Sequence, residues 1–280
     1  MKRVIACIDS SPCIYALADA AAWIAMKTHR ELVLLQVLDY YPASYHLGEI
    51  SGVIGFESNA MLLKELAELE QKQSELALDY SNNLLDYISK IIKDKHGIDA
   101  IHIQEKGDFL EESFAVFRED DIAVIGRLGE RSAERNKTLG SNVENLIRGA
   151  NCTVMTVSDT FKPPTRFIFA YEYSPTCVKM MKRIAQSDLL RLLQCHLLYV
   201  GDHPEILDEP AHYLAEAGLD VVTEYRYGDV AEHILSYQRE HGIQLIVMGA
   251  FSHSKIHQFF LGSITTTIFR NVAVPLLVIK

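Results

Sequence analysis

Two stretches of the chain combine an apolar run, a glycine and, further on, a Gly-Ser pair. In the later stretch, the apolar run 245–248 ends at Gly249, and Gly262-Ser263 precedes a helix-like apolar spacing over 264–269. This order predicts a strand, a loop and a helix N-terminus, where glycines let backbone N–H groups approach a ligand and the helix dipole favours negative charge. Such a loop suits a phosphate group. A plain loop with Ser263 as helix N-cap explains the same residues without any ligand.

The same arrangement occurs earlier in the chain. An apolar run at 122–125 ends at Gly126, Gly129 follows, and Gly140-Ser141 precedes a second helical pattern. The offset between the copies stays between 121 and 123 residues at three matched pairs: Gly107 and Gly228, Gly126 and Gly249, Gly140 and Gly262. A steady offset over a long segment indicates a duplicated unit.

The repeat predicts two domains, at 1–158 and 166–280, joined by a linker that contains Pro163-Pro164. With 49% hydrophobic and 23% charged residues, the composition is that of an ordinary globular protein. A formal net charge of −10 argues against nucleic-acid or anionic-membrane binding as the main role.

The targeting signals and the cysteines point to one compartment. No apolar run approaches the roughly 20 residues of a membrane span, and the run at 4–8 is too short for a signal peptide. The five cysteines are an odd number without a CxxC motif, which favours reduced thiols over disulfides or a zinc site. We therefore expect a cytoplasmic protein.

Strands and helices are expected to alternate along both halves. The expected strands are 3–8, 32–38, 98–104, 122–125 and 153–157, then 167–171, 195–200, 220–224, 245–248 and 275–279. Ser11 as N-cap and Pro12 as first helical residue predict the start of the first helix, and another helix is expected to run from Pro175 to about Leu193. This alternation predicts parallel sheets with helices on both faces, and Asp9, Gly126 and Gly249 fall just beyond strand ends, where such sheets bind ligands.

One expected helix is unusually long. Apolar residues recur at helical spacing from about 59 to 95, as one helix or two. An amphipathic crossover helix packed on the sheet is the favoured interpretation, and a partner-binding helix is the alternative.

The chain as a whole resembles the universal stress protein family in its tandem two-domain form. The resemblance is carried by the start VIACIDSS at 4–11, the glycine motifs, and the closing VPLLVI at 274–279. It implies two tandem doubly wound parallel-sheet domains of the adenine nucleotide alpha hydrolase-like type, with five strands each. It also implies cytoplasmic stress-response proteins, usually dimeric, in which tandem domains act as an internal dimer. Nucleotide-binding members hold ATP with an Asp after the first strand and a G-x2-G-x9-G-[S/T] loop.

Both halves match this pattern imperfectly. The matching residues of the first half are Asp9, Gly126, Gly129, Gly140 and Ser141, but ten residues rather than nine separate Gly129 from Gly140. Glu130 and Glu134 add negative charge near the expected phosphates, and the cations expected to offset it are Arg127, Arg131 and Arg135.

In the second half the matching residues are Gly249, Gly262 and Ser263. Ser252 replaces the second glycine, and Glu172 replaces the Asp. Tyr173 follows where a small residue is usual, so the Glu172-Tyr173 pair is expected to fill the adenine pocket. Whether one half or both bind ATP stays open.

Three functions follow from these patterns. The leading one is a stress-response protein that binds ATP or a related adenine nucleotide without catalysis. The alternative is a stress scaffold with degenerate loops that binds an unidentified protein partner through the long helix and the domain cleft. With either function, an internal pseudo-dimer is expected, and a homodimer is a further option. The third, an ATP-hydrolysing or adenylating enzyme, is not expected, because the phosphate loop has no evident general base beside it. His253 and His257 are four apart, but we expect them in a loop and predict no metal site.

Overall fold

The computed structural model describes residues 2–39, 56–127, 141–249 and 263–280. Within these residues the strands are β1 (Arg3–Cys7), β2 (Glu31–Asp39), β3 (Ala100–Gly107), β4 (Ile122–Gly126), β5 (Thr153–Val157), β6 (Arg166–Tyr171), β7 (Gln194–Val200), β8 (Val221–Arg226), β9 (Leu245–Gly249) and β10 (Leu276–Ile279). The helices are α1 (Ile14–Thr28), α2 (Phe56–His96), α3 (Phe109–Val116), α5 (Ser141–Gly149), α6 (Pro175–Ala185), α7 (Asp208–Glu216), α8 (Val230–Glu240) and α9 (Ser263–Asn271). Short 3-10 turns lie at Leu190–Leu192 and Pro204–Leu207.

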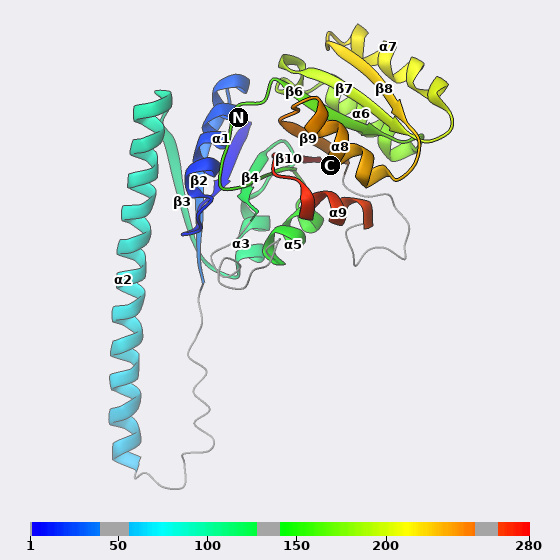
Figure 1. The fold of residues 1–280 in the computed structure, drawn as a ribbon. Helices are drawn as coiled ribbons and strands as arrows, with labels where there is room; N and C mark the ends of the chain where they lie inside the picture. Colours follow the sequence, from blue (N-terminus) through cyan, green and yellow to red (C-terminus); the bar gives the residue numbers. More distant parts are fainter. Residues whose placement is uncertain (1, 40–55, 128–140, 250–262) are drawn as a thin grey trace.

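All of these strands belong to a single sheet (Figure 1). Its order is β3-β2-β1-β4-β5-β10-β9-β6-β7-β8, so each half contributes five strands in the same sequence, mirrored about the middle. Neighbouring strands within each half are parallel, whereas β5 and β10 pair antiparallel. The expected fold class is confirmed. The two halves share one continuous sheet, which the sequence does not predict.

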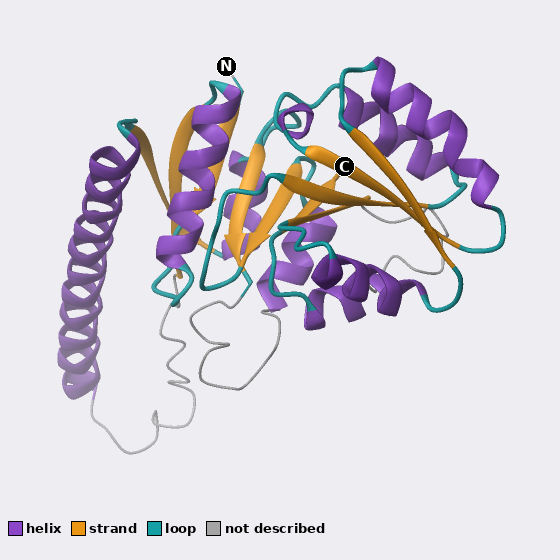
Figure 2. Ribbon diagram, turned by 45° about the horizontal axis from the view of Figure 1, so that its top comes forward, coloured by secondary structure: helices purple, strands orange, loops and turns teal. Residues whose placement is uncertain are grey.

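The central strands are apolar because both of their faces are covered. Along β1, Val4 and Ala6 belong to one core cluster, and Ile5 and Cys7 belong to the other. Helices α1, α2, α6 and α7 cover the first face, and α3, α5, α8 and α9 cover the second (Figure 2). A strand buried on both faces has no polar side to show, which explains its continuous apolar run.

The junction between the halves is buried. Leu276 pairs with Thr156, Leu277 with Met155, and Val278 with Val154, and each of these residues is at most 2% exposed. Both core clusters contain residues of both halves, so the apolar interior continues through the junction. We therefore expect the two halves to unfold together rather than as independent units.

The first helix starts later than expected. The predicted Ser11 N-cap is wrong, because α1 begins at Ile14 and its N-cap is Cys13, which makes no side-chain capping bond. The backbone N–H of Ser11 instead donates to Asp9 Oδ1 at 3.1 Å. This local bond holds residues 9–11 in a turn, and the helix starts two residues later than expected.

A second helix ends earlier than expected. The segment from Pro175 ends at Ala185 rather than near Leu193, and a 3-10 turn follows at Leu190–Leu192. The backbone N–H of Leu190 donates to Ser187 Oγ at 3.3 Å, and Arg191 Nε donates to the carbonyl of Ala185 at 3.1 Å. These polar contacts satisfy the helix end and start the next turn.

The long pattern forms one helix, α2, of 41 residues, which corresponds to about 60 Å. Its second half packs on the sheet through a stripe of buried residues: Ser81, Leu85, Ile88 and Ile92. Ser81 Oγ also donates to Gln36 Oε1 of β2 at 2.6 Å. The favoured crossover-helix interpretation therefore holds for this half, while the first half extends past the carboxyl end of β2 (Figure 1).

A buried ion pair joins the amino end of β1 to the residue before β4. Arg3 Nη2 lies 2.5 Å from Asp121 Oδ2, with side-chain exposures of 9% and 1%. Asp121 Oδ2 also accepts the backbone N–H of Arg118 at 2.9 Å, and Arg3 Nη2 donates to the carbonyl of Val116 at 2.8 Å. At the equivalent place in the second half, Gln244 Oε1 accepts the backbone N–H groups of Thr165 and Arg166 at 3.1 and 3.2 Å. The second half thus replaces a buried ion pair with a neutral side chain.

These two positions give a matched pair of substitutions. Asp121→Ala should lower the free energy of unfolding by about 3–5 kcal/mol, because it leaves the Arg3 guanidinium buried without its counter-charge. Gln244→Ala should cost at most about 1 kcal/mol, the usual worth of neutral hydrogen bonds. Urea titration of both variants measures the difference, and equal losses would contradict the assigned role of the ion pair.

Candidate functional site

The residues expected to bind phosphate gather where β1 and β4 end. These neighbouring parallel strands pair with Ala6 opposite Val124. From β1 the chain moves outward to β2 and β3, and from β4 it moves the other way to β5, so the sheet has its switch point here. Asp9 follows β1 by two residues, and Gly126 is the last residue of β4. The structure therefore brings Asp9 and Gly126 to the edge where such sheets bind ligands.

The helix after the glycine motif starts at the same edge. Ser141 is the first residue of α5, and α5 leads back to Thr153, where β5 starts at the amino edge of the half. Its N-terminus therefore faces the carboxyl edge, as expected for an anion site. Gly129 and Gly140 lie outside the described residues.

A buried hydroxyl without a partner among the described residues lies close to Asp9. Ser11 is 2% exposed, and its hydroxyl has no hydrogen-bond partner among the described residues. The first turn of α1 beside it has no side-chain cap. Ser10 Oγ lies 3.2 Å from the hydroxyl of Tyr80, which α2 brings to this edge from far along the chain. A buried polar group without a partner is unusual and marks a place where a ligand can complete the bonding.

At the corresponding edge of the second half, the polar groups form hydrogen bonds with one another. Ser174 Oγ accepts the backbone N–H of Cys177 at 3.2 Å, which caps α6, and it donates to Glu172 Oε1 at 2.9 Å. Tyr173 is 78% exposed. The expectation that Glu172 and Tyr173 fill a pocket is therefore wrong: both side chains are exposed, and the carboxylate of Glu172 is engaged by the cap.

The glycine motif of the second half is only partly described. Gly249 is the last residue of β9, and a Cβ there would lie 3.1 Å from Met180 Sδ, so the glycine allows α6 to pack closely. Ser263 is the first residue of α9. Ser252 and Gly262 lie outside the described residues.

Arg127 has a different role from the one expected. The sequence predicted that Arg127 offsets negative charge beside phosphates. The residue is instead only 7% exposed, and its guanidinium donates to the carbonyls of Phe269 and Val272. These carbonyls lie at the end of α9, in the other half of the chain, where the helix dipole favours a cation. Burial lowers the pKa of Arg127 from its ordinary value.

The reciprocal contact is made by Lys280. Its Nζ donates to the carbonyl of Arg148, near the end of α5, at 3.1 Å. Both helices that follow glycine motifs therefore receive a cation at their C-terminal end from the opposite half.

The comparisons with known proteins agree with this geometry. The sequence profile described as the universal stress protein family matches residues 1–158 and 202–280. The chain belongs to the universal stress protein family. The universal stress protein Slr1230 of Synechocystis sp. is 28% identical over the whole length of both chains.

Solved structures of the family share the fold. A universal stress protein from Archaeoglobus fulgidus DSM 4304 superposes with a TM-score of 0.74 at 18% identity, covering 99% of this chain and 98% of the other. A putative universal stress protein from Pseudomonas aeruginosa UCBPP-PA14 gives a TM-score of 0.61 at 14% identity, covering 99% and 92%.

Sequence reasoning missed two polar groups of this universal stress protein site. Ser11 was expected to cap α1, yet its buried hydroxyl is unpaired among the described residues. Tyr80 lies 70 positions from Ser10, and no local pattern reveals that their hydroxyls meet. The signal for Ser11 was its place two residues after Asp9, whereas the contact of Tyr80 depends on how α2 packs.

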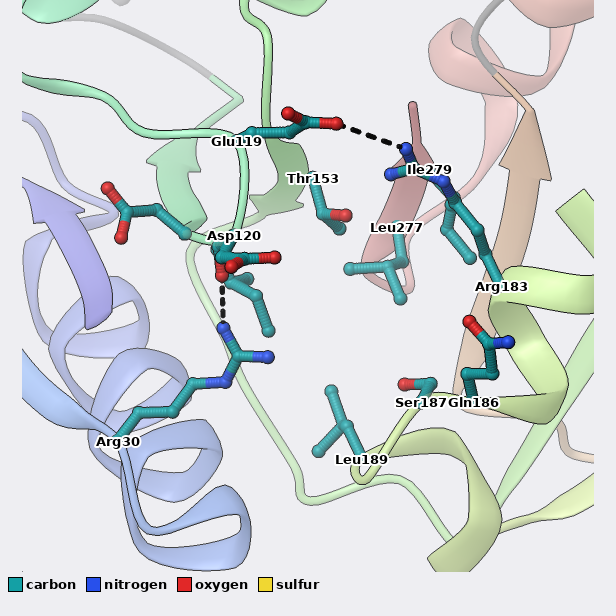
Figure 3. Close-up of a pocket in the computed structure, with 12 residues that line it drawn as sticks. Arg30, Glu119, Asp120, Thr153, Arg183, Gln186, Ser187, Leu189, Leu277 and Ile279 are labelled. Carbon is teal, nitrogen blue, oxygen red and sulfur yellow. Dashed lines mark hydrogen bonds and ion pairs between the residues drawn. The ribbon is translucent and has the colours of Figure 1, made fainter. Parts of the chain in front are cut away.

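A cavity of about 310 Å³ lies elsewhere, between the two halves (Figure 3). It opens at the amino end of β4, opposite the edge that carries Asp9, and its lining includes charged side chains from both halves: Arg30, Glu119, Asp120, Asp121 and Arg183. Arg30 Nη1 donates to the carbonyl of Asp120 at 2.5 Å, and Arg183 Nη2 lies 3.7 Å from Glu119 Oε1. Two arginines face three carboxylates there, and one of these, Asp121, is already neutralised by Arg3, so the lining favours no charge class of ligand.

The remaining reactive groups form no second site in the part of the chain that the structure describes. All five cysteines are buried and none forms a disulfide, and burial raises the pKa of Cys152 to about 11 and that of Cys177 to about 12. No cluster of potential metal ligands is found among those residues, nor does any helix there have the length and apolar character to cross a membrane. His253 and His257 fall outside the described ranges.

One buried histidine makes the stability of the fold depend on pH. His196 of β7 is 5% exposed, and its Nδ1 lies 2.9 Å from the hydroxyl of Tyr237. The ring of His241 stacks near Tyr237 at a centroid distance of 4.1 Å. Burial and the neighbouring His241 and Arg166 lower the pKa of His196, against the opposing effect of Asp220.

This lowered pKa predicts a loss of stability in weak acid. The unfolded chain binds the proton of His196 more readily than the folded chain does. The neutral ring of His196 therefore contributes fully to the stability of the fold at pH values above 6.5, the ordinary pKa of histidine. That contribution is lost as the pH falls below 6.5. His196→Gln should reduce the fall in melting temperature between about pH 7 and pH 5, whereas His212→Gln, at an exposed position, should leave it unchanged. An unaltered pH profile for His196→Gln would contradict the prediction.

Proposed function

We propose that this universal stress protein binds ATP or a related adenine nucleotide in its first half and does not turn it over. The observation that carries the proposal is the meeting of Asp9 and Gly126 at the switch point between β1 and β4. The family pattern uses these two positions to hold nucleotide. The buried hydroxyl of Ser11 and the uncapped first turn of α1 add donors at the same edge.

The second half is assigned a structural role in this proposal. Its equivalent carboxylate, Glu172, accepts a hydrogen bond from Ser174, which in turn caps α6. A ligand at this edge would compete with hydrogen bonds that the protein already makes, which reduces the gain on binding. We therefore expect one nucleotide per chain.

The proposal includes binding without catalysis, in the cytoplasm. The groups at the first edge are suited to hold an anion, and the sequence offers no nucleophile beside a general base. Buried cysteines that form no disulfide fit a reducing compartment. The two halves, 1–158 and 166–280, would act as an internal dimer, which the antiparallel pairing of β5 with β10 supports.

The alternative, a stress scaffold that binds no nucleotide, is favoured by one observation. Helix α2 exposes apolar side chains along the part that extends past the sheet, including Leu69 and Leu76 at 61% and 70%. This surface and a nucleotide site do not exclude each other.

Isothermal titration with ATP tests the proposal, and the duplication supplies the control. The wild-type chain should bind with a stoichiometry of about one. Asp9→Ala should weaken binding by about 10- to 100-fold, as expected when a charged group loses its hydrogen bonds to a ligand. Glu172→Ala at the equivalent position should leave the affinity unchanged, and thermal melts of both variants verify the fold.

Two results would contradict the proposal. Absence of heat from a protein sample free of 260 nm absorbance would argue against nucleotide binding altogether. Loss of affinity in Glu172→Ala but not in Asp9→Ala would move the site to the second half.

A further inference from the structure

Helix α2 carries a second apolar face that the sheet does not use. The face that packs on the sheet consists of Ser81, Leu85, Ile88 and Ile92. A different face carries Leu69, Leu76 and Tyr80, which we call the outer stripe and which are 61%, 70% and 56% exposed. Tyr80 keeps its hydroxyl at Ser10, so it offers only the exposed part of its ring to this face. Tyr87, at 52%, continues the stripe beside α1. Large apolar side chains gathered along one exposed helix face mark an interaction surface.

The outer stripe has the spacing of a coiled coil. Its residues, together with Tyr87, are seven, four and seven positions apart, which places all of them at a or d positions of one heptad repeat. The preceding a and d positions, 66 and 62, are leucines, so the repeat spans more than three heptads. Gln73 at an a position and Asn83 at a d position interrupt the apolar series, and polar residues at such positions restrict the register of pairing.

The charged residues beside the outer stripe indicate which helix can pair with it. Beside the stripe, Glu65 and Lys72 occupy successive g positions and are both exposed. In an antiparallel pair of identical helices g positions face g positions, so Glu65 of each copy meets Lys72 of the other. In a parallel pair g faces the e position of the next heptad, and Glu65 would meet Glu70. The helix is thus complementary to an antiparallel copy of itself.

We propose that the outer stripe is the interface of an antiparallel α2–α2 homodimer of this chain. Pairing Glu65 with Lys72 places the crossing point near Leu69 and overlaps residues 56–80 of the two copies. That overlap of 25 residues corresponds to about 37 Å of helix. Most of it lies on the part of α2 that extends past the sheet (Figure 1), and its last residues, Ser74 and Tyr80, reach the sheet edge at Lys106 and Ser10. The interface is independent of the junction between β5 and β10, which lies inside a single chain.

Sedimentation velocity of the full chain over a range of concentrations tests this interface. The wild type should form a dimer, and the Leu69→Glu, Leu76→Glu double variant should weaken dimerisation at least about 100-fold, because each copy loses two buried leucines. Leu192→Glu, at a 59% exposed leucine of the other half, is the matched control and should dimerise as the wild type does. A monomeric wild type at about 100 μM would overturn the proposal and leave the stripe to a different protein, and so would a dimer that survives the double variant.

Charge reversal tests the orientation without touching the apolar residues. Glu65→Lys and Lys72→Glu should each weaken the dimer by about fivefold or more, since each replaces two attractive pairs with two repulsive ones. The double reversal should restore wild-type affinity. Stronger dimerisation of Glu65→Lys, as a parallel pair requires, or failure of the double reversal to restore it, would overturn the antiparallel assignment.

Discussion

The antiparallel pairing of β5 with β10 is the constraint that organises this protein. It joins two parallel five-stranded units into one sheet and makes their carboxyl edges point in opposite directions. The carboxyl edge of each half therefore lies beside the amino edge of the other. That is why Arg127, directly after β4, reaches the C-terminal end of α9, and why Lys280, after β10, reaches that of α5. The halves are linked by buried charge as well as by the sheet.

The duplication has produced two units of the same topology in which equivalent positions make different hydrogen bonds. At the carboxyl edge, the first half keeps Asp9 near the hydroxyl of Ser11, which has no partner within the described ranges. In the second half, Glu172 and Ser174 hydrogen-bond to each other instead. At the amino edge, the ion pair of Arg3 and Asp121 becomes the neutral Gln244. Both differences concern hydrogen bonds rather than topology, which explains how the sheet order is preserved while the sites diverge.

The sequence predicted what depends on local pattern. Strand positions, the extent of the helical pattern that became α2 and the placement of Asp9, Gly126 and Gly249 at strand ends all follow from apolar runs and glycines, although one helix or two stayed open for α2. It did not predict what depends on distant contacts: the bond of Arg127 to Phe269 spans 142 positions, and the shared sheet requires β5 to pair with β10. The start of α1 was wrong for a local reason, because a hydrogen bond from Ser11 to Asp9 competes with the helix.

The most direct test of a nucleotide site in the first half is hydrogen–deuterium exchange of the full chain with and without ATP. The account predicts slower exchange with ATP at residues 8–14 and in the first turn of α5, with no change at residues 172–178 or in α9. Unchanged exchange throughout, or protection confined to the second half, would contradict it.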